Sequence, residues 1–401
     1  MAFEIPRVDP LPFRVAVIGG GGTGAALAWD LALRGFRVVI FERGEFLSGT
    51  TGRHHGQLHS GARYASGDPE IARECMAETL ALRRLVPDAI EYNGGLFVAL
   101  DGEEAAYGGR FAEACAEAGI PAREVSPARA RELEPGLSSR VERAFLVPDG
   151  TFDAWRVPAA FLAGARELGA ELRPWTGVVG FDATDGRVTA ARVRDRARAA
   201  AENRIEADCF VIACGAWGGT VGALAGLEVP VTPAAGSMLA VKGRLCDMVI
   251  SRLRPPGDGD ILVPQRGLSI IGSTQRLVES PDALLPTDEE IAFLRQSGAA
   301  LAPAFADAEI DSAWCAARPL FGSALDEAAG RAASRDFAVL DHETDGMAGI
   351  ASVVGGKATT LRVMAEKAAD LVCRKLGVER SCRTLETAPP SWRDLYRGRA
   401  P

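Results

Sequence analysis

The 401-residue sequence lacks several features that mark particular classes of protein. No apolar run reaches the roughly 18–20 residues that a membrane-spanning helix needs, and the first residues carry neither the basic nor the apolar stretch of a secretory signal. Acidic residues outnumber basic ones, 53 to 45, for a net charge of −8 at pH 7, so the basic character of a nucleic-acid-binding protein is missing. We therefore expect a cytoplasmic protein, or one held peripherally at the inner face of the membrane, that binds no nucleic acid.

The eight cysteines contain no CxxC pair. Their spacings fit neither a zinc nor an iron–sulfur site, and we expect reduced thiols packed as small apolar side chains, with no metal. Hydrophobic residues make up 47% and charged residues 24% of the chain, which excludes a disordered protein or a coiled coil. Glycine is abundant, with 45 of 401 residues, against a usual level of about 7%. This abundance favours tight turns or a close approach of the backbone to a ligand.

The segment from Arg14 to Glu42 carries the clearest local pattern. It reads as a strand, a glycine-rich turn, a helix and a second strand, and the turn has the spacing Gly19-x-Gly21-x-x-Gly24. In such a turn the first glycine permits the tight bend, the second lets a pyrophosphate approach the backbone, and the third lets the helix pack on the strand. The helix N-terminus offers N–H groups to phosphates, and Glu42 can accept hydrogen bonds from ribose hydroxyls. The segment therefore predicts a dinucleotide site.

The chain beyond this segment favours FAD over a nicotinamide dinucleotide. A nicotinamide-binding domain would continue with further strand–helix repeats, but a polar loop over 48–64 follows instead. Apolar strands of the same kind return only at 209–213 and 350–354. A nucleotide-binding domain built from three separated pieces is typical of a flavoprotein. The other expected elements are helices over 68–85, 109–118 and 288–297, strands near 178–208, 238–241 and 268–271, and a last helix that ends near 376.

Three of the four histidines lie in the polar loop after the second strand. Histidine is the natural proton acceptor near neutral pH, and the small neighbours of His59 favour a functional role for it. For His54 and His55 a catalytic role and a plain structural role are equally open. Near the end of the chain, Lys357 precedes the last helix, where a helix N-terminus and a cation can stabilise negative charge on a flavin ring. The alternative there is an ordinary helix start with a surface lysine.

A set of short motifs resembles the FAD-dependent glycerol-3-phosphate dehydrogenases. The likeness is strongest to the anaerobic large-subunit type, within the glycine-oxidase and D-amino-acid-oxidase-like superfamily, and covers nearly all of 13–385. The motifs are Val17–Tyr64, Gly94–Val98, Pro148–Gly150, Asp260–Pro264, Arg318–Leu320 and Gly355–Lys357. The resemblance implies an α/β fold of the D-amino-acid-oxidase and glutathione-reductase type, with a discontinuous Rossmann-like FAD-binding domain and a mixed-sheet substrate domain. The pieces expected for the FAD-binding domain are 13–90, 151–225 and 326–385, those for the substrate domain are 91–150 and 226–325, and a C-terminal tail covers 386–401.

The resemblance also implies an activity. Family members transfer a hydride from C2 of sn-glycerol 3-phosphate to flavin N5 and form dihydroxyacetone phosphate, and His59 would take the hydroxyl proton. The expected catalytic residues are His59, Arg63, Arg318 and Lys357. The residues expected to bind the substrate, a small anion, are Arg63, Tyr64, Arg318, Arg335 and Lys357. The residues expected to contact FAD are Gly19, Gly21, Gly22, Thr23, Gly24, Glu42, Arg43, Thr50, Thr51, Gly52, His55, Gly56, Leu58, His59, Val178, Ala213, Gly215, Trp217, Gly355, Gly356, Lys357, Ala358 and Thr359.

Three departures from the family pattern leave the substrate open. Gln57 replaces an apolar residue, Ala235 stands where relatives often have a basic one, and Leu361 replaces an aromatic one. The alternative substrates are a 2-hydroxy acid, an amino acid or a phosphonate. The cysteine-rich C-terminal domain of the anaerobic large subunits is also missing, so a polypeptide that is active only within a complex is a further alternative. The electron acceptor is open between a quinone, an electron-transfer protein and oxygen.

Overall fold

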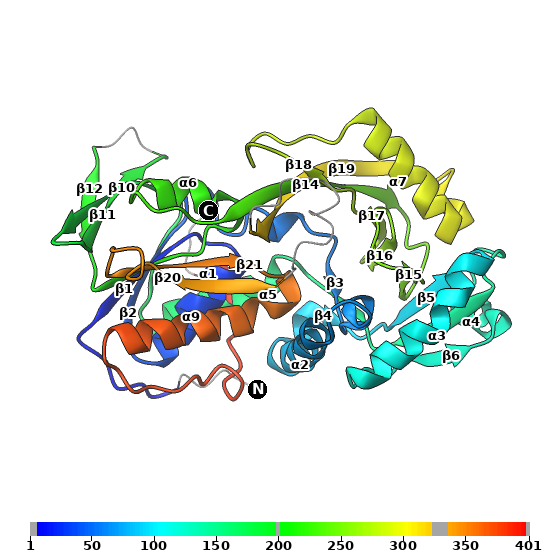
Figure 1. The fold of residues 1–401 in the computed structure, drawn as a ribbon, viewed down its shortest axis with the longest axis horizontal. Helices are drawn as coiled ribbons and strands as arrows, with labels where there is room; N and C mark the ends of the chain where they lie inside the picture. The colour runs from blue at the N-terminus through cyan, green and yellow to red at the C-terminus, as the bar shows by residue number, and fades with distance from the viewer. Residues whose placement is uncertain (1–5, 198–200, 323–335, 398–401) are drawn as a thin grey trace.

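Two large β-sheets dominate the computed structural model, which describes residues 6–197, 201–322 and 336–397 (Figure 1). The first sheet has the strand order β20-β21-β13-β1-β2-β9. All neighbours in it run parallel except β20, which is antiparallel to β21. Its strands are β1 (Arg14–Ile18), β2 (Arg37–Phe41), β9 (Glu171–Arg173), β13 (Cys209–Ile212), β20 (Phe337–Asp341) and β21 (Ile350–Gly355).

Both faces of the first sheet are buried, as expected for parallel strands that read as continuous apolar runs. Along β1, Val15 and Val17 join one apolar core with helices α1 (Gly22–Leu33), α5 (Arg156–Glu167) and α9 (Leu361–Lys375). Ala16 and Ile18 face the opposite core. That second core is closed by an antiparallel sheet of β10 (Thr176–Thr184), β11 (Arg187–Asp195) and β12 (Asn203–Glu206). The carboxyl ends of the parallel strands therefore meet at one edge, between the two covering layers.

The second large sheet is mixed and lies beside the first (Figure 1). Its order is β18-β14-β17-β16-β15-β5-β7-β6, and β19 pairs with β14. Its strands are β5 (Gly95–Ala99), β6 (Arg123–Val125), β7 (Arg143–Val147), β14 (Val231–Lys242), β15 (Val249–Arg252), β16 (Ile261–Gln265), β17 (Leu268–Gly272), β18 (Arg276–Leu277) and β19 (Ile310–Phe321). Among the described residues, the other α-helices are α2 (Pro69–Leu85), α3 (Gly102–Glu117), α4 (Pro127–Leu133), α6 (Gly218–Ala223) and α7 (Asp288–Leu301).

A further small sheet connects the histidine loop to the rest of the fold. It has the order β3-β8-β4, with β3 (Gln57–Leu58), β8 (Gly150–Phe152) and β4 (Ile90–Glu91). The polar loop is therefore more regular than its sequence predicts, because β3 pairs with β8 and fixes the residues that precede His59.

The predicted α/β architecture with a parallel nucleotide-binding sheet and a mixed second sheet is confirmed. The predicted start of the helix at Gly109 is wrong, because Asp101 caps α3 by accepting a hydrogen bond from the Glu104 backbone N–H at 3.0 Å. Helix α5 is missing from the prediction, and it contains Pro158. This proline is the third residue of the helix, where the absent N–H costs nothing. The boundaries proposed for the domains remain predictions.

Within the described ranges, no helix is both long and apolar enough to cross a bilayer. The eight cysteines are unpaired thiols. Burial raises the pKa of several of them, that of Cys75 to about 12, so at neutral pH these side chains pack as small apolar groups.

Candidate functional site: a dinucleotide cradle that opens onto a histidine loop

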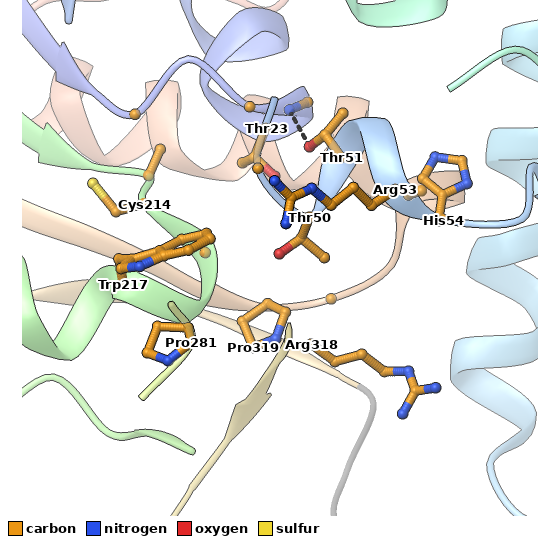
Figure 2. Close-up of a pocket in the computed structure, with 18 of the residues that line it drawn as sticks. Thr23, Thr50, Thr51, Arg53, His54, Cys214, Trp217, Pro281, Arg318 and Pro319 are labelled. Carbon is orange, nitrogen blue, oxygen red and sulfur yellow. Dashed lines mark hydrogen bonds between the residues drawn. The ribbon is translucent and has the colours of Figure 1, made fainter. Parts of the chain in front are cut away.

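A single cavity of about 730 Å³ runs along the carboxyl edge of the parallel sheet. The residues that follow β1, β2, β13 and β21 all line it, namely Gly19, Glu42, Ala213 and Gly356. In open α/β sheets, ligands bind at this edge. Figure 2 shows Thr23 and Thr51 on one wall of this cavity and Trp217 and Pro281 on the opposite side.

The glycine turn after β1 is packed so tightly that side chains are excluded. A Cβ on Gly19, whose φ is +105°, would lie 2.5 Å from the Ala213 carbonyl oxygen, and one on Gly24 would lie 1.9 Å from the Gly19 carbonyl oxygen. Gly24 therefore lets α1 rest on the end of β1. Gly21 faces the cavity, and a Cβ there would approach Thr51 Oγ1 to 3.1 Å. The turn thus presents bare backbone to whatever fills the cavity.

Two polar side chains hold this turn in place. The carboxylate of Glu42 accepts hydrogen bonds from the backbone N–H groups of Gly20, at 2.9 Å, and Gly44, at 3.0 Å. Thr51 Oγ1 accepts a bond from the Gly22 N–H at 2.9 Å, the dashed line in Figure 2. The loop after β2 is thereby fixed against the N-terminus of α1.

His59 is anchored by contacts from three other parts of the chain. Its backbone N–H donates to Thr359 Oγ1 at 3.3 Å, and its carbonyl accepts from Thr79 Oγ1, on α2, at 2.6 Å. The next N–H, of Ser60, donates to the buried carboxylate of Asp149 at 2.7 Å. Asp149 also accepts from the Gln57 side chain at 2.9 Å. The backbone on both sides of the imidazole is therefore fixed, which is what a positioned proton acceptor requires.

Several of the expected substrate residues lie close together. The His59 and Tyr64 rings have centroids 5.4 Å apart, and Lys357 Nζ lies 4.9 Å from the centre of the Tyr64 ring. Arg63 also lines the cavity, with a side chain only 4% exposed, and pairs with the buried Asp260 at 2.9 Å. Arg318 lines it too, and donates to Gln275 Oε1 at 3.2 Å. These residues place cationic groups and an imidazole along one cavity.

Comparison with known proteins identifies the family. The model of FAD-dependent oxidoreductases named DAO matches residues 14–362. The chain belongs to this family. It is 41% identical over 379 residues to a subunit of the anaerobic glycerol-3-phosphate dehydrogenase of Escherichia coli K12, a match that covers 94% of this chain and 70% of that protein. The corresponding protein of Haemophilus influenzae is 38% identical over 390 residues, 96% of this chain and 69% of its own.

Solved structures of DAO-type proteins have the same fold. Glycine oxidase from Geobacillus kaustophilus has a TM-score of 0.74 at 24% identity, over 92% of this chain and 96% of that chain. The glycerol-3-phosphate dehydrogenase from Bacillus halodurans, complexed with FAD, has a TM-score of 0.72 at 21% identity, over 94% of this chain and 67% of that chain. The protein is therefore an FAD-dependent oxidoreductase with the DAO fold, as the motifs predict.

We call the part of the cavity beside Gly19–Gly24, Glu42 and Thr51 the dinucleotide cradle. The cavity that contains it fits the FAD of this family. Its volume lies within the range of roughly 300–1,000 Å³ found for ligand sites. The bare backbone at Gly21 leaves room for a pyrophosphate beside the N-terminus of α1, whose N–H groups and dipole favour anions. Each oxygen of Glu42 accepts one backbone bond and retains a lone pair for a ribose hydroxyl.

Most of the residues expected to contact FAD line the cavity. They are Gly19, Gly21, Gly22, Thr23, Glu42, Arg43, Thr50, Thr51, His55, His59, Val178, Ala213, Gly215, Trp217, Gly355, Gly356, Lys357, Ala358 and Thr359. Four others lie behind its wall: Gly24 against β1, Gly52 against Trp155, Gly56 against Gln265, and Leu58 in the core. Arg335 falls outside the described residues, so its expected role in binding the substrate stays a prediction. Of the three departures from the family pattern, Gln57 and Leu361 line the cavity, whereas Ala235 is buried within β14.

His54 is a cavity residue whose role the sequence leaves open. Its Nδ1 accepts a hydrogen bond from the Gly56 N–H at 2.9 Å, and its ring lies against Phe152 at 5.0 Å. The other nitrogen, Nε2, is shielded from solvent and has no partner among the described residues. Burial lowers the pKa of His54 to about 4, although Asp153 opposes that shift. His54 is therefore neutral at pH 7, with its proton on Nε2.

Sequence reasoning found Arg318 on the second sheet but missed other cavity residues that come from that sheet and its connections. Gln275 immediately precedes β18, and Pro281, Asp282 and Ala283 come from the segment between β18 and α7. Nothing in their local sequence indicates a ligand. They reach the cavity through the tertiary fold, in which β14 pairs with β18 and β19, and this pairing cannot be read from a short segment.

Proposed function

We propose that this protein oxidises sn-glycerol 3-phosphate to dihydroxyacetone phosphate. The observation that carries the proposal is a continuous cavity that joins the dinucleotide cradle to the cluster of His59, Tyr64 and Lys357, with Arg63 and Arg318 in the same lining. The 41% identity to a subunit of the anaerobic glycerol-3-phosphate dehydrogenase of Escherichia coli supports the choice of substrate.

The residues of the cluster have complementary tasks in this reaction. Bound FAD supplies the acceptor for the hydride that leaves C2 of the substrate. His59 takes the proton of the C2 hydroxyl, and its anchored backbone keeps the imidazole in place for that transfer. Arg318 and Lys357 bind the phosphate dianion, with a guanidinium fork suited to two of its oxygens. Holding the substrate in one orientation is the larger contribution, because it replaces a random encounter by a fixed geometry.

Arg63 forms an ion pair with a buried carboxylate. Its guanidinium donates to Asp260 at 2.9 Å and to the Gly257 carbonyl at 3.1 Å. Because Asp260 also accepts from Arg254, it balances only part of this positive charge. The Nη1 of Arg63 is buried and has no partner among the described residues, so it can donate to the anion.

Anaerobic addition of sn-glycerol 3-phosphate to the purified holoenzyme tests the proposal. We expect the visible flavin absorbance to bleach to completion, faster than with any other compound in a panel of a 2-hydroxy acid, an amino acid, a phosphonate analogue and glycerol. A flavin that stays yellow with sn-glycerol 3-phosphate contradicts the proposal. Reoxidation of the bleached protein with a quinone, an electron-transfer protein and oxygen in turn identifies the electron acceptor.

One observation favours a second substrate class. Gln57 lines the cavity, and its Oε1 has no partner within the described parts of the chain. An amide in place of an apolar side chain suits a substrate whose polar groups are placed differently from those of sn-glycerol 3-phosphate, such as a 2-hydroxy acid or a phosphonate. Preference for one of these in the panel would establish this alternative.

A further inference from the structure

The segment between β18 and α7 reaches the far end of the cofactor cavity from the second sheet. Pro281, Asp282 and Ala283 line that cavity. Asp282 Oδ1 accepts two hydrogen bonds, from Arg43 Nη2 at 2.7 Å and from Trp217 Nε1 at 2.9 Å. Asp282, which follows a strand of the second sheet, therefore contacts two residues that follow strands β2 and β13 of the first sheet.

The two donors also contact each other. The guanidinium carbon of Arg43 lies 4.4 Å from the centre of the Trp217 ring, within the range of a cation–π interaction. Arg43, Trp217 and Asp282 thus form a closed triangle of contacts, which we call the clasp. Partial burial alone would raise the pKa of Asp282, but the bonds from Arg43 and Trp217 hold that pKa below its ordinary value. Asp282 is therefore ionised at neutral pH and keeps both bonds.

The position of the clasp follows from the direction in which a dinucleotide lies in the cavity. Glu42 marks the ribose of the adenosine half, and Arg43 is the next residue in the chain. Figure 2 shows Trp217 and Pro281 next to each other at one end of the cavity, with His54 and the Arg318 guanidinium at the other. The clasp therefore lies at the adenosine end, away from the histidine loop.

We propose that Asp282 is a positioning residue that closes the adenosine end of the cavity and slows the release of FAD. It acts through Arg43, which it holds over the Trp217 ring, and release of the adenosine half requires that this contact opens. Because Asp282 belongs to the segment that joins β18 to α7, the clasp also ties the second sheet to the bound cofactor. The proposal concerns FAD retention and does not depend on the substrate.

The expected effect is moderate, because the charged groups of the clasp are partly exposed. The side chains of Arg43 and Asp282 are 43% and 56% exposed, and an ion pair of this kind contributes little alone. The two hydrogen bonds to Asp282 Oδ1 and the contact of the Arg43 guanidinium with the Trp217 ring increase the contribution of the clasp to FAD retention. We expect Asp282→Asn to release FAD about three- to tenfold faster than the unaltered protein.

Glu279→Gln is the matched control. Glu279 lies three residues earlier in the same segment, is exposed, and is not among the described residues that line the cavity. It removes the same charge without touching the clasp. The measurement is the rate at which free FAD fluorescence appears after dilution of the holoenzyme, at low and high salt. Faster release in Asp282→Asn alone, with less dependence on salt, supports the proposal.

A double-mutant cycle separates the clasp from a general loss of charge. In an Arg43→Gln background, Asp282→Asn should add little further acceleration, because its partner is already absent. Trp217→Phe, which keeps a ring but loses the N–H donor, should accelerate release less than Asp282→Asn. Release from Asp282→Asn at the unaltered rate, or equal acceleration by Glu279→Gln, would overturn the proposal. No substrate is present, so failure of the proposed reaction leaves this result intact.

Discussion

The hydroxyl oxygen of Thr359 accepts a hydrogen bond from the backbone N–H of His59 over 3.3 Å, although 300 residues separate the two in the chain. Thr359 lies in the short turn that enters α9, and His59 lies in the polar loop after β2. The bond therefore joins the first and last pieces of the nucleotide-binding half of the protein at the point where the substrate is expected. It explains how a glycine-rich loop can hold an imidazole in a fixed place.

Replacement of His59 tests the role of that imidazole. We expect His59→Gln to retain FAD but to slow anaerobic flavin reduction about 10²- to 10⁴-fold, the usual contribution of a positioned proton acceptor. Stopped-flow absorbance measures the rate, and the visible spectrum reports the FAD content. Thr79→Val is the control, since it removes one anchor of His59 and keeps the ring. The lost hydrogen bond should lower the free energy of unfolding by about 1 kcal/mol. Equal rates in His59→Gln and the unaltered protein would remove His59 from the mechanism.

Gly24 offers a test of the cradle itself. A Cβ at Gly24 would lie 1.9 Å from the Gly19 carbonyl oxygen, so Gly24→Ala must push α1 away from β1. We expect a loss of about 1–3 kcal/mol in the free energy of unfolding, together with weaker FAD binding. Gly109→Ala is the matched control. Gly109 is exposed within α3, and a Cβ there meets none of the described atoms within 4 Å. Urea unfolding of both holoenzymes should show that only the first is destabilised.

The buried pair of Arg63 and Asp260 predicts a combined effect on stability and substrate affinity. Asp260 is fully buried, and besides Arg63 it accepts a bond from Arg254 at 2.9 Å. Asp260→Asn leaves both arginines without this partner and should cost about 3–5 kcal/mol of stability. In the folded fraction of the Asp260→Asn variant, we expect a higher KM for sn-glycerol 3-phosphate and a smaller change in kcat. Glu132→Gln, which breaks an exposed pair with Arg129, should change neither quantity measurably.

A stable Asp260→Asn protein with an unchanged KM would contradict the role given to Arg63. The conservative variant Asp260→Glu keeps the charge and should restore part of the affinity. This rescue separates the loss of the carboxylate from a general loss of packing.

His54 predicts a dependence of stability on pH. Its pKa is about 4 in the folded protein and about 6.5 when unfolded. Between these values the unfolded chain binds more protons, so stability is complete above about pH 6.5 and is lost as the pH falls toward 4. We expect a contribution of about 3 kcal/mol. His54→Gln, whose amide can accept the Gly56 N–H and does not titrate, should flatten this part of the urea-unfolding profile. An identical slope in both proteins would refute the assignment.

The sequence predicts the nucleotide half of the site well because its determinants are local. Glycine spacing, a following helix and Glu42 lie within one short segment, and the backbone geometry that they require is the one observed. The histidine loop can be located in the same way, since three histidines in a glycine-rich loop stand out from their surroundings.

Other parts of the site could not be found from the sequence because they depend on tertiary contacts. Asp149 fixes the backbone beside His59 from a turn between two strands, and Asp282 arrives from the second sheet. An isolated aspartate in a loop is usually a solvated charge. Asp282 belongs to no motif, and Asp149 lies in the Pro148–Gly150 motif, to which the sequence assigns no role. The predicted start of α3 is wrong for a related reason. The capping side chain of Asp101 outweighs the two glycines that weaken the helix pattern further along.

The most direct test of the central claim is the rate of anaerobic flavin reduction by sn-glycerol 3-phosphate that carries deuterium at C2. If the hydride from C2 passes to the flavin beside His59, the labelled substrate should bleach the flavin several-fold more slowly than the unlabelled one. A flavin that remains yellow with both substrates, or bleaches at the same rate with each when reduction itself is the step observed, would contradict the account.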